Sequence, residues 1–266
     1  MATGQFWDMP IETGEIPPSK SEFDCIVVGG GPGGAAAASY LAMDGKKVLL
    51  VERGVWPRDK VCGDAVGGKS LSHVNALGVK AKLESSPHFK VTGIVFSSPN
   101  GNAVTVPLPE EDVEKLQAGY SLPRQQFDWL LFERATELVL ENGGSVIQGG
   151  MVTNVYDTDG VITGVEVGIG GKKGEKRDYS APWTIGAGGY LCPVAKKIIR
   201  DLEKEELVDR MHYCGGYREY WTGVKGCEGD AGNIEIHFVD SIIPVSYTHL
   251  RAHETRGNLV CRLLLE

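Results

Sequence analysis

Residues 24–52, DCIVVGGGPGGAAAASYLAMDGKKVLLVE, determine the fold that we expect for this chain. They open with an apolar run over 25–28, which is short enough for a buried parallel strand. A glycine-rich turn follows, then an alanine-rich helix over 35–43 and a second buried strand over 47–51 that Glu52 closes. This order of strand, turn, helix, strand and acidic residue predicts an α/β unit that binds a dinucleotide.

The turn has the spacing Gly29-x-Gly31-x-x-Gly34, and each glycine has a mechanical role. Gly29 allows the tight turn, Gly31 lets a pyrophosphate approach the backbone, and Gly34 lets the helix pack closely on the strand. The N–H groups at the helix start attract phosphate, and Glu52 can accept a hydrogen bond from a ribose 2′-OH. Because all these features agree, we favour a dinucleotide site over a glycine loop that binds nothing.

The composition narrows the classes of function. The 266 residues carry a formal net charge of -8, so no basic surface favours a nucleic-acid partner. No apolar run approaches the roughly 20 residues of a membrane-spanning helix. The six cysteines form no CxxC pair, and residues 1–22, which lack the features of a signal peptide, are expected to be a flexible leader. We expect a cytoplasmic protein, and peripheral contact with a membrane stays open.

The remaining sequence predicts further elements around this unit. We expect helices over 70–77, after Pro123 and over 194–206, and strands over 91–96, 103–106, 145–148, 152–156, 161–167, 213–221 and 234–238. The helix after Pro123 has an apolar face that we assign to the core: Phe127, Leu130, Leu131, Ala135 and Leu138. Turn residues at 97–102 and 158–160 predict two hairpins, which suggests an antiparallel sheet inserted into the parallel α/β pattern.

Two side chains outside the glycine turn, those of Cys62 and Arg124, are candidates for a role in a functional site. Cys62 lies among glycines and ionisable residues in a loop, so it is either a small buried cysteine or a reactive, cofactor-facing thiol. Arg124 begins a helix, where the dipole does not favour a cation, so we expect an anionic or polar neighbour; a surface arginine is the alternative. His249 and His253 lack a third ligand, and we expect no metal site.

Taken together, five segments resemble the geranylgeranyl reductase family, within the p-hydroxybenzoate hydroxylase-like group of flavoproteins. The resemblance covers about 23–244, and its most discriminating segment is Lys60-Val61-Cys62-Gly63-Asp64-Ala65, which is similar to the digeranylgeranylglycerophospholipid reductases. The other segments are the GGGPGG turn with Glu52-Arg53, Arg124 with Phe127-Asp128, the run Gly186-Ala187-Gly188-Gly189, and His237-Phe238 through Pro244. Many relatives have Gly-Ala-Asp-Gly in place of 186–189, so any role of that acid does not transfer.

The resemblance implies a Rossmann-like FAD-binding domain with an inserted, incomplete antiparallel β substrate domain. The FAD-binding domain would comprise 23–90, 118–160 and 180–203, and the substrate domain 91–117 and 204–244. The implied FAD contacts are Gly29, Gly31, Gly34, Glu52, Arg53, Cys62, Gly63, Ala65, Arg124, Val152, Gly186 and Gly188. In this assignment Glu52 holds the adenosine ribose, and Cys62, Gly63 and Ala65 lie along the flavin.

The implied reaction is hydride transfer from reduced FAD to an isolated double bond of a prenyl lipid or isoprenoid chain. NAD(P)H or another reductant would reduce the flavin, and we nominate Cys62 as the proton donor. A flavin monooxygenase or halogenase, a flavoprotein that passes electrons to quinone, and an inactive nucleotide-binding fragment are the alternatives. Strands 213–221 and 234–238 are rich in aromatic residues, as the lining of an apolar ligand would be.

The last segment, 245–266, differs in character from the rest of the chain. The acidic character of the chain gives way there to Arg251, Arg256 and Arg262, and the sequence resembles the translation of a sequencing adapter joined to a truncated read. We therefore interpret 245–266 as a non-native tail, and we expect the family's C-terminal part to be missing.

Overall fold

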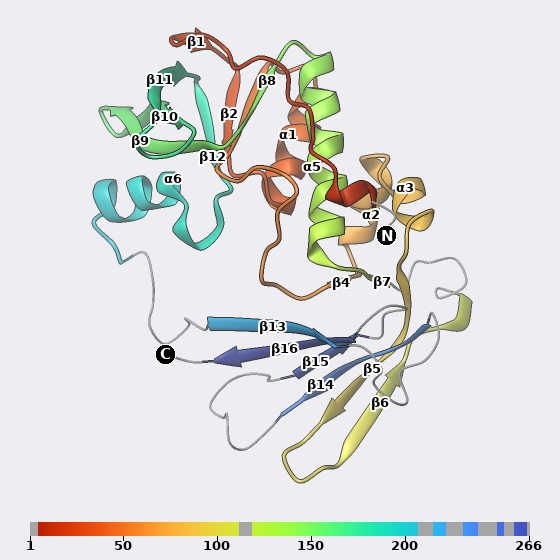
Figure 1. The fold of residues 1–266 in the computed structure, drawn as a ribbon. Helices are drawn as coiled ribbons and strands as arrows, with labels where there is room; N and C mark the ends of the chain where they lie inside the picture. The colour runs from red at the N-terminus through yellow and green to blue at the C-terminus, as the bar shows by residue number, and fades with distance from the viewer. Residues whose placement is uncertain are drawn as a thin grey trace. The chain divides into compact units, whose positions relative to one another are not determined.

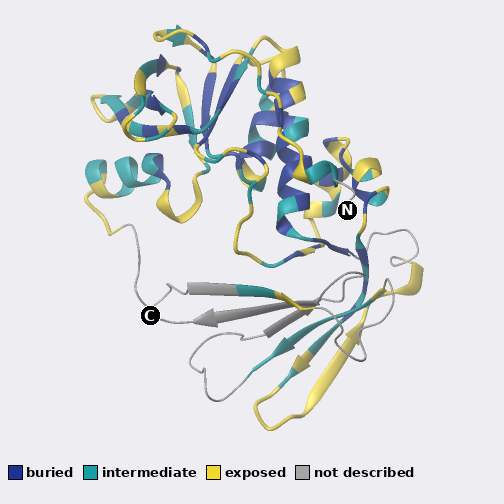
Figure 2. Ribbon diagram, viewed as in Figure 1, coloured by how far each residue is buried: buried dark blue, intermediate teal, exposed yellow. Residues whose placement is uncertain are grey.

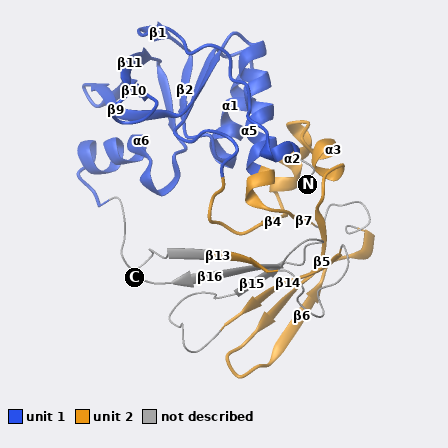
Figure 3. Cartoon of the chain, in the orientation of Figure 1, with its two compact units in different colours: residues 1–58, 128–209 blue, residues 59–127, 210–266 orange. Residues whose placement is uncertain are grey.

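The computed structural model describes residues 5–111, 119–206, 215–221, 231–238, 249–252 and 258–264. The chain forms two compact units (Figure 3): unit 1 comprises Met1–Arg58 and Asp128–Asp209, and unit 2 comprises Asp59–Phe127 and Arg210–Glu266. The segments 59–90 and 118–127, which we assigned to the FAD-binding domain, lie in unit 2. The two units are described separately below.

Unit 1 contains the strand–helix–strand arrangement that the sequence predicts (Figure 1). Strand β2 (Cys25–Val28) leads into helix α1 (Pro32–Met43), and β3 (Val48–Glu52) lies parallel to β2. Every residue of β2 and β3 is buried, which explains why both strands are continuous apolar runs. The predicted helix was too short at its start, because Pro32 already occupies the first helical turn, a position that proline tolerates.

Two more strands complete this parallel sheet. Its order is β12-β2-β3-β8, with β8 at Ser145–Gln148 and β12 at Trp183–Gly186. All three strand pairs are parallel. The carboxyl ends of β2 and β3 therefore meet at one edge, where ligands of open α/β sheets bind.

A second sheet in unit 1 has the order β1-β11-β10-β9. Its strands are β1 (Ser21–Glu22), β9 (Gly150–Thr158), β10 (Val161–Ile169) and β11 (Glu175–Ser180). The hairpin predicted at 158–160 joins β9 and β10. A buried apolar cluster links the two sheets; it includes Ile26, Leu49, Val155, Val165 and Val167. Figure 2 colours the buried segments of the chain dark blue.

Helix α5 and the helical segment that follows β12 differ in how well the sequence anticipates them. Helix α5 (Arg124–Glu141) forms as expected, and all five residues assigned to its apolar face are buried. The helix predicted over 194–206 is shorter and irregular: α6 (Pro193–Ala195) continues as a π-helical segment, η3 (Lys196–Leu202). The helical segment ends early, and Lys204, which follows it, adopts a left-handed conformation with φ of 63° that does not continue a helix.

The segment expected as a flexible leader makes specific contacts over its described residues. Trp129 Nε1 donates to Met9 O at 2.9 Å, and Gln148 Nε2 donates to Ile11 O at 2.6 Å. Tyr179 Oη donates to Pro17 O at 2.9 Å. After the short 3-10 helix η1 (Phe6–Asp8), the segment thus follows the surface of unit 1 until β1 pairs with β11.

Unit 2 is built on a third sheet. Within the described ranges its order is β13-β16-β15-β14-β5-β7-β4, and β6 pairs with β5. The predicted hairpin at 97–102 joins β5 (Phe89–Ser97) to β6 (Ala103–Pro107). The other strands are β4 (Ala65–Val66), β7 (Tyr120–Ser121), β13 (Gly215–Trp221), β14 (Ala231–His237), β15 (His249–Ala252) and β16 (Asn258–Leu264). Helices α2 (Ser70–Ala76) and α3 (Lys80–Glu84) precede β5.

Several sequence predictions extend beyond the described residues. Outside the described ranges lie residues 1–4 of the expected leader, residue 118 of the expected FAD-binding domain, His253, and residues 112–117, 207–214, 222–230 and 239–244 of the expected substrate domain. The interpretation of 245–266 as a tail stays a prediction. Among the helices that the structure describes, none is long and apolar enough to cross a bilayer.

Candidate functional site

A cavity of about 280 Å³ lies in unit 1 at the carboxyl ends of β2 and β3. Its wall combines the end of β2, the end of β3, the start of β9 and the segment that follows β12. The lining residues are Val28, Gly29, Val51, Glu52, Arg53, Gly150, Met151, Val152, Thr153, Lys172, Gly188, Leu191, Pro193 and Lys196. Five residues that the sequence assigned to the cofactor therefore share one cavity: Gly29, Glu52, Arg53, Val152 and Gly188.

Glu52 is the buried acid of this cavity, with 6 % of its surface exposed. Its Oε2 accepts from Gly30 N at 2.7 Å, and its Oε1 accepts from Gly54 N at 2.8 Å. These two bonds fix the carboxylate at the end of β3. A carboxylate has about four acceptor positions, so Glu52 can still accept hydrogen bonds from the hydroxyl groups of a ligand.

The glycine turn has the shape that a pyrophosphate requires. A Cβ at Gly34 would lie 1.8 Å from Gly29 O, so this position accepts only glycine while helix and strand stay packed. At Gly31, which caps α1, a Cβ would meet nothing within 4 Å. The space beside Gly31 is therefore open to a ligand, and the unpaired N–H groups of the first turn of α1 are suited to phosphate.

Three cations line the same cavity: Arg53, Lys172 and Lys196. Among the described residues, none of the three has a carboxylate partner within ion-pair distance. Since Glu52 contributes a single negative charge, the lining carries a positive excess. Such a lining favours an anionic ligand.

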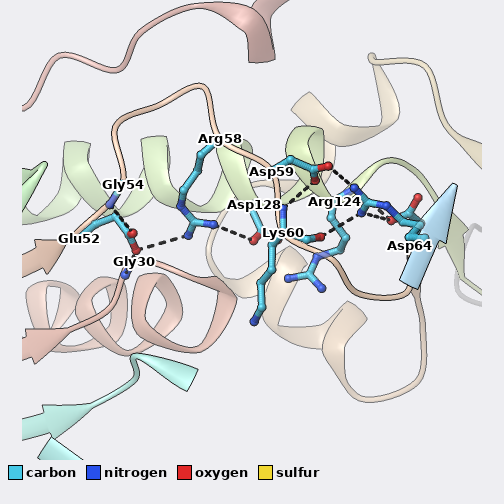
Figure 4. A network of polar contacts seen from close by, with 10 residues as sticks. Gly30, Glu52, Gly54, Arg58, Asp59, Lys60, Asp64, Arg124 and Asp128 are labelled. Atoms are coloured by element: carbon cyan, nitrogen blue, oxygen red, sulfur yellow. Dashed lines mark hydrogen bonds and ion pairs between the residues drawn. The ribbon is translucent and has the colours of Figure 1, made fainter. Parts of the chain in front are cut away.

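Arg58 supports Glu52, and the sequence analysis did not identify it. Its Nη2 lies 3.4 Å from Glu52 Oε2, and its Nη1 lies 3.8 Å from Asp128 Oδ2 (Figure 4). The guanidinium also stacks on Trp56, with Cζ 4.4 Å from the ring centroid. Arg58 thus joins the acid of β3 to a buried carboxylate of α5. Its only signal in the sequence is its place six residues after Glu52, in a loop read as charged.

Unit 2 holds the loop that carries Cys62. The thiol is exposed, so the alternative of a small buried cysteine is wrong. Arg218 of β13 anchors this loop: it donates to Lys60 O at 3.0 Å, forms an ion pair with Asp59, and lies 3.4 Å from Asp64 Oδ1. Figure 4 shows the contacts that converge on Asp59 and Asp64.

Asp64, the neighbour of Gly63, is buried, with 1 % of its surface exposed. Its Oδ2 accepts from Tyr220 Oη at 2.9 Å, and its Oδ1 accepts from Arg124 N at 3.2 Å. Burial raises the pKa of Asp64 to about 6, although the bond from Tyr220 and the charges of Arg218 and Arg124 act in the opposite direction. Burial and the Asp64 charge also raise the pKa of Tyr220.

Arg124 is buried rather than a surface arginine, with 7 % of its surface exposed. Asp64 is the anionic neighbour that the sequence led us to expect, because its carboxylate accepts from the backbone of Arg124 and its pKa responds to the charge of Arg124. The contact places a carboxylate at the first residue of α5, where the helix dipole favours negative charge.

The remaining predicted residues fall into two groups. A Cβ at Gly186 would lie 2.9 Å from Cys192 Sγ and from Val194 Cβ, so this glycine packs the end of β12 against α6 and does not line the cavity. Cys62, Gly63, Ala65 and Arg124 belong to unit 2, and their contact with a flavin stays a prediction.

In the described part of the chain, no group of three His, Cys, Asp or Glu residues could hold a metal ion.

Comparison with protein families and known proteins adds to this geometry. A family model described as "FAD binding domain" matches residues 22–230. Protein FixC of Salmonella typhi is 32% identical over 151 residues, which are 56% of this chain and 34% of FixC. The menaquinone reductase of Mycobacterium tuberculosis is 26% identical over 185 residues, 69% of this chain and 42% of that protein. The chain thus spans less than half the length of these curated relatives.

Solved structures with the same fold include enzymes of different chemistry. The myxobacterial chondrochloren halogenase CndH has a TM-score of 0.70 at 21% identity, covering 92% of this chain and 53% of the halogenase. A geranylgeranyl bacteriochlorophyll reductase-like protein of Thermoplasma acidophilum has a TM-score of 0.64 at 19% identity, covering 92% of this chain and 57% of that protein. These likenesses confirm the predicted fold class.

Proposed function

Because the chain belongs to the FAD-binding domain family, we propose that it is part of an FAD-dependent oxidoreductase that reduces carbon–carbon double bonds of geranylgeranyl or other prenyl chains. The substrates would be lipids or isoprenoids. NAD(P)H or another reductant would supply the electrons, and the protein would act in the cytoplasm, with access to prenyl chains at a membrane surface.

The cavity of unit 1 is the observation that supports the cofactor assignment. The cavity combines a fixed acid, Glu52, with a positive lining, and the helix start at Gly31, two residues after the lining residue Gly29, has open space beside it. The adenosine diphosphate half of FAD offers the matching groups, since its ribose hydroxyls can donate to Glu52 and its phosphates suit the helix start and the cations. The residues present therefore fit FAD.

Bound FAD would supply the hydride in this reaction, and the protein must supply the rest. An isolated alkene has no carbonyl group to stabilise charge, so the rate depends on orientation, exclusion of water and a well-placed proton. Unit 2 contributes exposed apolar side chains that suit a prenyl chain, among them Phe96, Val104, Tyr220 and Trp221. Cys62, which is exposed in the same unit, stays our sequence-based nominee for the proton donor.

Two lines of support favour reduction. The segment 60–65 resembles the prenyl reductases, and two of the similar proteins are named as a menaquinone reductase and as reductase-like. The menaquinone reductase name also supports a second candidate, in which the flavin passes its electrons to a quinone.

Anaerobic turnover of the complete gene product separates these functions. FAD-loaded protein should saturate the double bonds of a geranylgeranyl lipid when dithionite or NAD(P)H is present and oxygen is absent. Reduction of menaquinone without saturation of the prenyl lipid would favour the second candidate. Product formation that requires oxygen would instead indicate a monooxygenase or halogenase and would contradict the proposal.

A further inference from the structure

The turn between β10 and β11, residues 170–174, borders the cavity of unit 1. Strands β10 and β11 pair as far as Ile169 and Glu175, and Ile169 also pairs with Gly150 at the start of β9. Lys172 of this turn lines the cavity, as Gly150 does. The turn therefore belongs to the wall of the proposed cofactor site, although the sequence pointed to none of its residues.

A series of backbone hydrogen bonds connects this turn to Glu52. Gly170 N donates to Gly149 O at 3.0 Å, and Gly149 N donates to Gly54 O at 3.1 Å. Gly54 N in turn donates to Glu52 Oε1 at 2.8 Å. The turn and the acid of the cavity are thus fixed to each other through main-chain groups, so the backbone that carries Lys172 has a defined place relative to Glu52.

Glycines allow the chain to make these bonds. Gly149 and Gly170 have φ of 69° and 78°, in the left-handed region that favours glycine. A Cβ at Gly174 would lie 1.7 Å from Ile169 O, so the end of the turn has no room for a side chain. A two-residue turn would suffice to join antiparallel strands. The longer turn at 170–174 therefore has a conformation that the connection alone does not require.

The charges near the turn leave Lys172 available to a ligand. The Nζ of Lys176 on β11 lies 3.4 Å from Glu166 Oε1 and donates to Thr153 Oγ1 at 2.8 Å. Glu166, which accepts from the lining residue Thr153, is therefore already neutralised. Lys172 has no carboxylate partner within ion-pair distance among the residues that the structure describes.

We propose that the turn 170–174 is a binding element of the FAD site and that Lys172 is a specificity-determining residue, which attracts the diphosphate of the cofactor. This inference rests on the assignment of FAD in the proposed function. Gly29, where the glycine turn begins, lines the same cavity as Lys172. A diphosphate held at the glycine turn therefore shares the cavity with the Lys172 ammonium group.

The charge of the lining fits a diphosphate. Arg53, Lys172 and Lys196 come from three separate segments of the chain, and Glu52 is the single carboxylate among the described lining residues. The lining thus has an excess of two positive charges, which is comparable to the charge of the diphosphate in FAD. Removal of Lys172 would halve this excess and weaken the attraction for an anion. Uncharged adenosine would lose little, so Lys172 distinguishes a charged nucleotide from an uncharged nucleoside.

The test compares the affinities of ADP and adenosine for the complete protein freed of FAD, measured by isothermal titration calorimetry. ADP carries the diphosphate and adenosine lacks it, so the ratio of the two affinities isolates the effect of charge. We expect Lys172→Met to bind ADP about fivefold more weakly at low salt, as for the loss of an exposed ion pair, and to bind adenosine like the wild type. The difference should shrink at about 0.5 M salt, which screens exposed charges.

Two further variants serve as controls. Lys173→Met removes the same charge from the neighbouring exposed residue, which does not line the cavity, and should bind ADP like the wild type. Lys172→Arg keeps the charge at the cavity and should retain most of the affinity for ADP.

The outcomes separate this inference from the proposed function. Equal ADP affinities of Lys172→Met and Lys173→Met would overturn the inference and leave the proposed function standing, as would a loss that is the same for ADP and adenosine. Protein that binds FAD and loses ADP affinity only in Lys172→Met, but saturates no prenyl chain, would contradict the proposed function alone. A wild type that binds neither ADP nor FAD would overturn both.

Discussion

At Asp64, burial and hydrogen bonding act in opposite directions on one carboxyl group. Burial favours the protonated form, and the bond from Tyr220 with the charges of Arg218 and Arg124 favours the ionised form. Burial is the larger effect, so the folded state holds a proton that the unfolded chain releases at lower pH.

This proton predicts a pH dependence of stability. Between the ordinary value of 3.8 and the folded value of about 6, the folded state binds more protons than the unfolded state, so the free energy of unfolding falls as pH rises. Relative to Asp64→Asn, the wild type should lose at most about 3 kcal/mol over this interval. Urea denaturation of both proteins at several pH values measures the difference, and a difference that stays constant from pH 4 to pH 7 would contradict the assignment.

Arg58 predicts a second effect at the residue scale. Arg58→Met keeps the apolar stem beside Trp56 but removes the cation between Glu52 and the buried Asp128. We expect a loss of about 1–3 kcal/mol in stability, because two buried carboxylates lose a hydrogen-bonding partner, and weaker FAD binding, measured by thermal unfolding and by flavin fluorescence. The control is Arg134→Met on the exposed side of α5, where Arg134 pairs with Glu137; surface pairs of this kind contribute little. Equal effects of both substitutions would argue against the role of Arg58.

At the scale of elements, the tight packing of β2, the glycine turn and α1 predicts opposite effects for two neighbouring glycines. Gly34→Ala would place a Cβ 1.8 Å from Gly29 O, whereas a Cβ at Gly33 meets nothing within 4 Å. We expect Gly34→Ala to destabilise the protein by about 3 kcal/mol or more. Gly33→Ala should be neutral or stabilising by up to about 1 kcal/mol, because alanine favours the helix.

Thermal unfolding of the two glycine variants without added FAD measures this difference. A Gly34→Ala variant as stable as Gly33→Ala would show that the turn is not packed as described.

The elements also show what sequence reasoning can predict. The sequence predicted β2, β3, α5 and both hairpins correctly. Burial imposes continuous apolar runs on strands and a periodic apolar face on helices, and the backbone conformation of tight turns favours glycine and asparagine. The π-helical segment after Pro193 was missed because no residue pattern distinguishes it from an α-helix. Asp64 and Arg58 were missed as site residues because their partners, Tyr220 and Asp128, lie far away in the sequence.

At the scale of the whole molecule, the chain leaves unit 1 after Arg58 and returns at Asp128. The sequence predicted such an insertion but placed the first boundary at 90, because the loop and helices over 59–84 carry no β pattern. The cavity in unit 1 is assembled from segments on both sides of this insertion, since Glu52 precedes it and Val152 follows it. The cofactor assignment therefore requires that unit 1 fold correctly around the insertion.

The affinity of the protein for FAD, measured by flavin fluorescence in the wild type and in Glu52→Gln, tests the central claim most directly. If Glu52 holds the adenosine ribose, E52Q should bind FAD about ten- to a hundredfold more weakly, since a hydrogen bond to a charged group contributes about 1.5–3 kcal/mol. Glu137→Gln on the exposed surface of α5 is the matched control and should bind FAD like the wild type. No FAD binding by the wild type, or equal affinity of wild type and E52Q, would contradict the account.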